Sequence, residues 1–137
     1  MSQIYTLLCQ RLPAAVHHQR RLPGGGTYIF VPWRNLCDHF HAHCPSWQVA
    51  WGTPVFVDAY CVVDCTITID GVQRSAIGNA IIEMLSADGK DMSRGTPIER
   101  AAADAFRNAA ELWGVGAYLR DQGETRRWLA GQGWRPQ

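Results

Sequence analysis

Hydrophobic residues recur with two different periods along this chain. Between residues 96 and 113 they fall every three to four positions, which places them on one face of a helix. Thr96-Pro97-Ile98-Glu99 forms a capping box with proline at the first helical position, and Gly114 marks the end. The pattern therefore predicts a long helix whose alanines allow close packing against a sheet. Its apolar stripe consists of Ile98, Ala101, Ala102, Ala105, Phe106, Ala109, Leu112 and Trp113.

β-branched and aromatic residues dominate the middle of the chain. They predict strands at Trp47–Trp51, Val55–Val63 and Cys65–Ile69, and Asp70-Gly71 after the last of these is a strong hairpin signal. In the returning strand, Gln73–Glu83, small residues occupy one face, which indicates that a helix packs closely there. The sequence thus predicts an antiparallel meander of three to four strands packed against the long helix.

Shorter elements flank this core. They are a helix at 3–12, a strand at 28–31, a helix at 33–44 and a short helix at 124–130. Residues 13–26, which end in Leu-Pro-Gly-Gly-Gly, and the polar stretch 86–95 are predicted to be loops. The expected fold is α+β, with the meander on one long helix and short flanking helices. We expect a single domain over 1–137, in which about 120–137 form a C-terminal helix and tail.

The composition, 47% hydrophobic and 18% charged, is that of a folded domain and not of a disordered chain. No apolar run approaches the roughly 20 residues of a membrane helix. The first residues lack the pattern of a signal peptide. The five cysteines are therefore expected to be free thiols in the reducing environment of the cytoplasm.

The net charge of +1 conceals a division along the chain. Residues 1–34 carry +4, residues 35–92 carry −5 and residues 93–137 carry +2. If the two basic segments meet in space, they form a positive groove that suits a polyanion; ordinary charge scatter is the alternative. Twelve of the thirteen basic residues are arginine, whose planar guanidinium pairs with phosphate in a bidentate manner.

Candidate catalytic chemistry is sparse. The only lysine, Lys90, is followed by Asp91, so there is no Walker A loop, and neither a G-x-S-x-G motif nor a pair of carboxylates occurs. We therefore expect neither an enzyme nor a cofactor. The segment Cys37–Cys44 holds two cysteines and three histidines within eight residues, but Cys37 and Cys44 also lie on the apolar face of a predicted helix. We expect buried thiols and no metal there, with a structural zinc as the alternative.

Two groups of arginines are candidates for contact with a polyanion. Arg20 and Arg21 directly precede Leu-Pro-Gly-Gly-Gly, so guanidinium groups and backbone N–H groups could reach the same phosphate. A flexible turn with exposed arginines is the alternative. Arg100 and Arg107 lie two turns apart on the polar stripe of the long helix, where pairs with acidic neighbours are the alternative. Tryptophans and tyrosines exposed beside these segments could stack on bases, although most are expected in the core.

Taken together, these segments resemble the Rad-fifty-two-type single-strand annealing proteins, and the bacterial DdrA-like group most of all. The resemblance covers about residues 3–119. It rests on the order of the segments Arg21-Leu22-Pro23-Gly24-Gly25-Gly26, Tyr28–Val31, Asp70-Gly71 and the helix from Gly95-Thr96-Pro97-Ile98-Glu99 to Trp113-Gly114.

The resemblance implies a ring or open helical homo-oligomer with single-stranded DNA in a positive groove. The family's groove arginine falls on Arg21, and its basic pair in the long helix falls on Arg107 and Asn108, of which the second is not basic here. Lys90 and Arg94 lie in the loop where the family carries further bases. The expected DNA-binding set is Arg20, Arg21, Lys90, Arg94, Arg100 and Arg107.

The function expected on this basis is ATP-independent binding and annealing of single strands in DNA repair and homologous recombination. Such a protein would act in the cytoplasm at the nucleoid, away from membranes, with itself and other repair or recombination proteins as partners. Duplex DNA stays open as a ligand. The alternative is a self-assembling scaffold or protein-interaction module of the same fold that has lost annealing.

Overall fold

The computed structural model describes residues 2–83, 89 and 95–136. The chain divides into two compact units. Met1–Pro45 and Gly114–Gln137 form the first, here called the hairpin unit, and Ser46–Trp113 form the second, the sheet unit. The described residues include four α-helices and two antiparallel sheets, and a helix packs on the larger sheet, so the predicted α+β class is confirmed.

The sheet unit is built around one central strand. β5 (Tyr60–Ile69) pairs over its whole length with β6 (Val72–Ile81). Its other side pairs with β3 (Gln48–Trp51) near the carboxyl end and with β4 (Val55–Val57) at the start. All of these pairings are antiparallel, which confirms the predicted meander.

Two aspartates with positive φ shape the turns of this sheet. Asp70 (φ 49°) and Gly71 (φ 78°) form the predicted two-residue hairpin turn between Ile69 and Val72. The prediction of one strand over Val55–Val63 was wrong, because Asp58 (φ 51°) reverses the chain and folds β4 back on β5. Aspartate tolerates this left-handed conformation, but a run with no glycine near Asp58 gave no turn signal.

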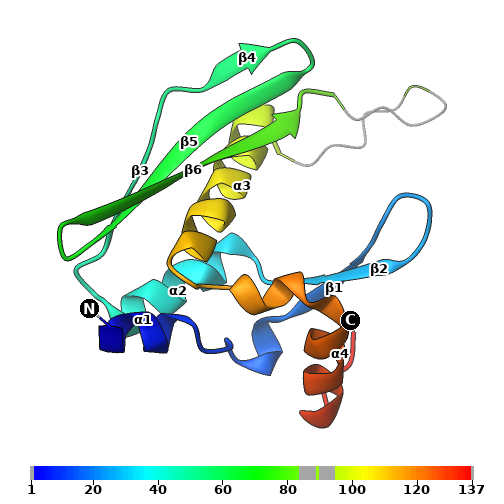
Figure 1. Cartoon of the computed structure of the whole chain (residues 1–137). Coiled ribbons are helices and arrows are strands. Elements are labelled where there is room, and N and C mark those ends of the chain that lie inside the picture. The colour runs from blue at the N-terminus through cyan, green and yellow to red at the C-terminus, as the bar shows by residue number, and fades with distance from the viewer. Residues whose placement is uncertain (1, 84–88, 90–94, 137) are drawn as a thin grey trace. The chain divides into compact units, whose positions relative to one another are not determined.

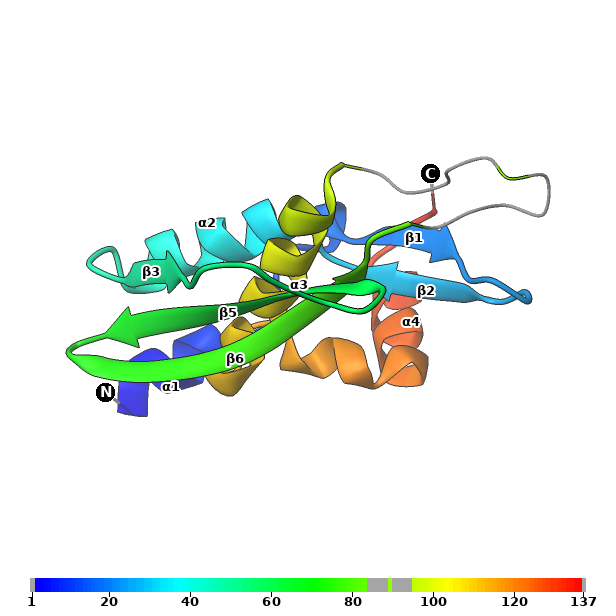
Figure 2. The ribbon, with the colours of Figure 1, turned by 90° about the horizontal axis from the view of Figure 1, so that it is seen from above.

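Helix α3 (Pro97–Leu112) crosses one face of the sheet (Figures 1 and 2). Its start follows the predicted capping box, since Thr96 Oγ1 accepts from the backbone N–H of Glu99 at 3.1 Å and donates to the Glu99 carboxylate at 3.2 Å. Buried Ala101 and Ala105 let the helix approach the buried Gly78 of β6. The small residues noted in the sequence therefore serve close packing, as predicted.

A ladder of polar side chains from α3 closes the free edge of β6. Arg100 donates to the carbonyl of Ile81, Asp104 accepts from the N–H of Asn79 at 3.0 Å, and Asn108 donates to the carbonyl of Ile77 at 2.9 Å. Four helical residues rise about 6 Å, close to the span of two strand residues, so the register holds over three rungs. These residues are structural partners of the sheet and not a purely solvated stripe.

The hairpin unit carries more structure than the sequence indicated. It comprises α1 (Ser2–Leu8), the 3-10 helix η1 (Ala14–Val16), β1 (His18–Arg21), β2 (Thr27–Phe30), α2 (Trp33–His43), the 3-10 helix η2 (Ala117–Arg120) and α4 (Gln122–Gly131). The prediction of a loop over 13–26 was wrong, because residues 18–21 pair with 27–30 as an antiparallel hairpin. The sequence His-Gln-Arg-Arg is polar and typical of a loop. It is extended here because it forms the backbone hydrogen bonds of a strand with β2.

A buried histidine joins two ends of the hairpin unit. The ring of His17, 2% exposed, lies 3.0 Å from the carbonyl of Pro13 through Nδ1 and 2.7 Å from the Tyr118 hydroxyl through Nε2. Because Nδ1 must donate to the carbonyl, Nε2 of the neutral ring accepts from Tyr118. Burial lowers the pKa of His17 and raises the pKa of Tyr118 to about 12, so both groups are held neutral.

Candidate nucleic-acid interface

Arg20 and Arg21 lie at the end of β1, directly before the glycine turn of the β1–β2 hairpin. Leu22 N–H donates to the carbonyl of Gly26 at 3.1 Å, and Gly24, Gly25 and Gly26 take φ values of 83°, 101° and 81°. Only glycine adopts three such conformations in succession without strain, which explains the Gly-Gly-Gly motif. Successive strand residues point to opposite faces, so the two exposed arginines present guanidinium groups on both faces of the ribbon.

One face of this hairpin combines cations with aromatic rings. The Arg20 guanidinium lies 5.5 Å from the ring centroid of Tyr28 and 5.3 Å from that of Phe30, and the His18 ring lies 5.8 Å from Phe30. Tyr28 and Phe30 are half-buried and so keep part of each ring open. The sequence analysis did not identify His18 and Phe30 as candidate site residues. The alternation of these residues with Gln19 and Ile29 places them on the face of Arg20 and Tyr28, but this signal can be used only if residues 18–21 are recognised as a strand.

The two units carry opposite formal charges. The hairpin unit holds eight arginines and three acidic residues, a formal charge of +5, and the sheet unit holds five basic and nine acidic residues, −4. No acidic residue occurs anywhere in residues 1–37, a range that includes the whole β1–β2 hairpin. The hairpin unit is therefore the more electropositive of the two.

The other predicted DNA-binding residues belong to the sheet unit. Arg107 is half-exposed and lies 3.7 Å from the Asp104 carboxylate, and Arg100 donates to the carbonyls of Gly95 and Ile81. Lys90 and Arg94 lie outside the described residues. Arg21 and Arg107 are in different units, so the prediction that they line one groove stays a prediction.

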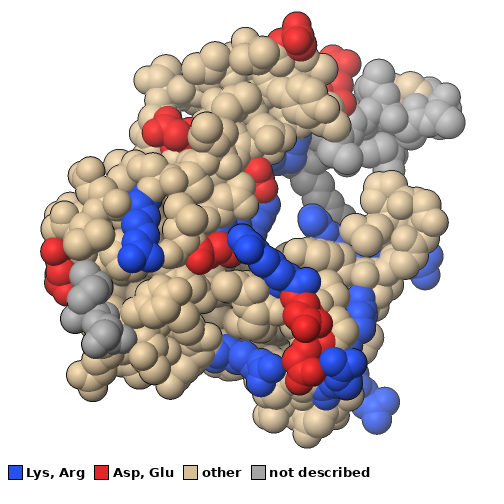
Figure 3. Space-filling view, viewed as in Figure 1, with Lys and Arg blue, Asp and Glu red and all other residues tan. Residues whose placement is uncertain are grey.

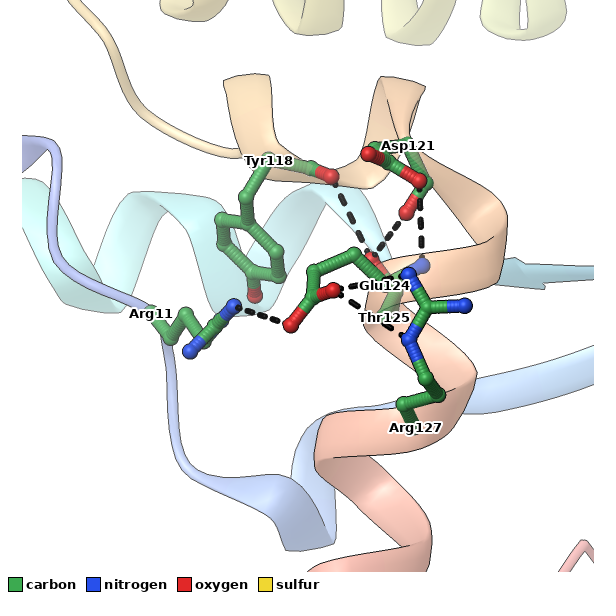
Figure 4. Close-up of polar contacts among 6 residues, drawn as sticks. All are labelled: Arg11, Tyr118, Asp121, Glu124, Thr125 and Arg127. Atoms are coloured by element: carbon green, nitrogen blue, oxygen red, sulfur yellow. Dashed lines mark hydrogen bonds and ion pairs between the residues drawn. The ribbon is translucent and has the colours of Figure 1, made fainter.

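Two arginines at α4, Arg11 and Arg127, share one acidic neighbour, Glu124, and blue and red surfaces lie side by side there in Figure 3. Glu124 accepts from Arg127 at 2.8 Å and lies 3.9 Å from Arg11 (Figure 4). The Arg11 guanidinium also lies 5.1 Å from the Trp128 ring centroid. Asp121 caps the helix by accepting from the N–H of Glu124 at 3.0 Å. These pairs make this surface a weaker site for phosphate than the acid-free hairpin.

In the Cys37–Cys44 segment, Cys44 is buried as expected, whereas Cys37 is only partly buried. His39 Nε2 bonds to the carbonyl of Leu8 at 3.1 Å. Within residues 2–83, 89 and 95–136, no group of three or more His, Cys, Asp or Glu side chains is placed to hold a metal ion.

The open face of the sheet, opposite α3, carries exposed apolar side chains at the end where β4 pairs with β5, beside polar residues such as Asp64 and Asn79. The register places Val55, Val57, Tyr60, Ile77 and Ile81 on this face, and all five are exposed, Ile77 to 64%. The alternation of residues 73–81 indicated one face of small residues but did not show that the other face is left uncovered. Exposed apolar patches of this kind mark interaction surfaces.

The sequence matches no family model and no curated protein. Among the helices of the described residues, none has both the length and the apolar character to cross a membrane.

Proposed function

We propose that this protein binds single-stranded DNA along the β1–β2 hairpin and anneals complementary strands without a nucleotide cofactor. One observation carries the proposal: Arg20 and Arg21 are both exposed, and Arg20 lies over the partly open rings of Tyr28 and Phe30, on an acid-free hairpin of a unit with formal charge +5. The resemblance of the ordered motifs to single-strand annealing proteins points the same way. The cellular role would be DNA repair and recombination at the nucleoid, alongside other proteins of those processes.

The chemistry of the hairpin suits a ligand read by its backbone. Guanidinium groups bind phosphates without regard to sequence, and an open ring such as Tyr28 stacks on any base. The sugar-phosphate backbone of the DNA is then held extended, while the bases that are not stacked on the protein stay free to pair with a complementary strand. Duplex formation supplies the free energy of annealing, so no ATP is needed. Arg107, which is half-exposed, would add a further contact with the phosphates of the bound DNA strand.

Self-association is part of the proposal. One protein chain of this size spans few nucleotides, so a continuous DNA-binding surface needs several subunits. The open sheet face with Val55, Val57 and Ile77 supplies a surface that a second copy would cover, and a head-to-tail contact produces a ring or a filament.

The test is fluorescence anisotropy of a labelled oligonucleotide at several salt concentrations. We expect Arg20→Ala and Arg21→Ala to weaken binding and to reduce the slope of log K against log salt by about 0.7 for each phosphate that the protein no longer neutralises. Arg127→Ala removes the same charge from a residue paired with Glu124 and is the matched control. Equal affinity and slope in all four proteins would refute the hairpin site. Complementary fluorescent strands mixed without ATP test annealing, and duplex DNA serves as a competitor.

A self-assembling scaffold is the second candidate, favoured by the sheet unit. The residue matching the family's second base, Asn108, is bonded to the Ile77 carbonyl, and Arg107 is paired with Asp104 in a unit of charge −4. A scaffold would form oligomers in size-exclusion chromatography and leave an oligonucleotide unshifted at moderate salt. A DNA-annealing protein would shift it.

A further inference from the structure

Helix α4 closes the free edge of β2 with side chains. Gln122 accepts from the N–H of Ile29 at 2.8 Å and donates to the carbonyl of Ile29 at 3.0 Å. Its amide thus forms both hydrogen bonds that a neighbouring strand would form with that residue. The Gln122 amide also donates to the carbonyl of Leu119 at 2.7 Å, which fixes its orientation.

Arg126, one turn later on α4, ties the two strands of the hairpin together. It donates to the carbonyl of Thr27 on β2 at 2.6 Å and to the Gln19 side chain on β1 at 3.3 Å. Gln122 and Arg126 are four residues apart on α4 and bond to residues two apart on β2, which is the same spacing that joins α3 to the edge of β6. The guanidinium of Arg126 is thereby engaged with the hairpin itself and is not presented to solvent as Arg127 is.

We propose that Gln122 and Arg126 are positioning residues for the DNA-binding hairpin, an inference that rests on the proposed function. An isolated two-stranded hairpin is marginally stable in water. Thr27 and Ile29, the residues held by α4, alternate with Tyr28 and Phe30, whose rings lie under Arg20. The clamp formed by Gln122 and Arg126 therefore fixes the aromatic–arginine face in one geometry. Arg126, although basic, acts through the hairpin and not as a phosphate ligand.

Gln122→Ala separates positioning from electrostatics, because it changes no charge. We expect oligonucleotide affinity to fall about 5- to 10-fold while the salt slope is unchanged, since the variant neutralises the same number of phosphates. The exchange of the Ile29 amide, measured by NMR, should accelerate about 5- to 10-fold because its acceptor is gone.

The adjacent arginines supply a matched pair. Arg126→Ala should weaken binding about 5- to 10-fold, and Arg127→Ala less than about 2-fold, although each removes one positive charge from the same helix. Arg126→Lys keeps the charge but lacks the planar fork that reaches both strands, so it should restore only part of the affinity.

The outcomes are distinguishable. Unchanged Ile29 exchange in Gln122→Ala would overturn the clamp. Faster exchange with unchanged affinity would overturn the positioning role. Equal decreases in affinity for Arg126→Ala and Arg127→Ala, with full recovery in Arg126→Lys, would show that charge alone acts at this helix and would also overturn it. A wild-type protein that binds no oligonucleotide would instead overturn the proposed function.

Discussion

Replacing Gly78 by alanine tests the packing that defines the sheet unit. A Cβ added to Gly78 would collide with the backbone N of Ala105. The same Cβ would lie 2.5 Å from the Cα of Ala105 and 2.7 Å from the carbonyl oxygen of Ala101. Ordinary carbon contacts lie at about 3.5–4.0 Å, so α3 must retreat by roughly 1 Å. The obstacle is helix backbone, which cannot rotate away as a side chain can.

The cost follows from what this retreat breaks. Overpacking alone costs about 1–3 kcal/mol. A 1 Å shift also lengthens the bonds of Asp104 and Asn108 to β6 from 3.0 and 2.9 Å to about 4 Å, beyond hydrogen-bonding range, at about 1 kcal/mol each. We therefore expect Gly78→Ala to lower the free energy of unfolding by roughly 3–5 kcal/mol, a large part of a typical domain's stability.

Urea unfolding followed by circular dichroism measures this decrease. Gly52→Ala is the control in the same unit, because the atoms nearest to its new Cβ belong to the exposed Asp64 carboxylate, which can rotate; the expected decrease is under about 1 kcal/mol. Adding Ala105→Gly should not rescue Gly78→Ala, since the conflict is with backbone atoms. A Gly78→Ala protein as stable as Gly52→Ala, with an equal m value, would refute the close approach of α3 to β6.

Two further predictions concern stability. Burial lowers the pKa of His17 below its ordinary 6.5, so below about pH 6.5 the unfolded chain binds more protons than the folded protein, and the free energy of unfolding declines by up to about 1.4 kcal/mol per pH unit. His17→Gln should therefore show a smaller difference between its urea midpoints at pH 7.5 and 5.0 than the wild type. An identical difference would contradict the conclusion that buried His17 is held neutral. Thr96→Ala removes the cap on the Glu99 N–H and should cost about 1 kcal/mol in the same assay, whereas Thr96→Ser should retain most of it; equal stability of the two variants would show that the cap does not contribute.

Local signals were sufficient for α3 and for the turn between β5 and β6. The capping box at Thr96 acts within four residues, and the Asp70-Gly71 turn requires positive φ at two adjacent positions, so both can be recognised without tertiary information. The reversal at Asp58 could not, because aspartate is compatible with either an extended or a left-handed backbone. β1 was missed for the related reason that a polar strand becomes a strand only through its partner.

The candidate site divides in the same way. The sequence by itself determined that Arg20 and Arg21 precede a glycine turn and that acids are absent around them, since both are facts of residue order. Only the tertiary structure decided which polar residues are free for a ligand. Asn108 and Arg126 look like surface groups in the sequence, yet each is bonded to a strand edge far away along the chain. An unpaired backbone edge attracts polar side chains from whichever helix lies beside it, and the fold alone sets that neighbour.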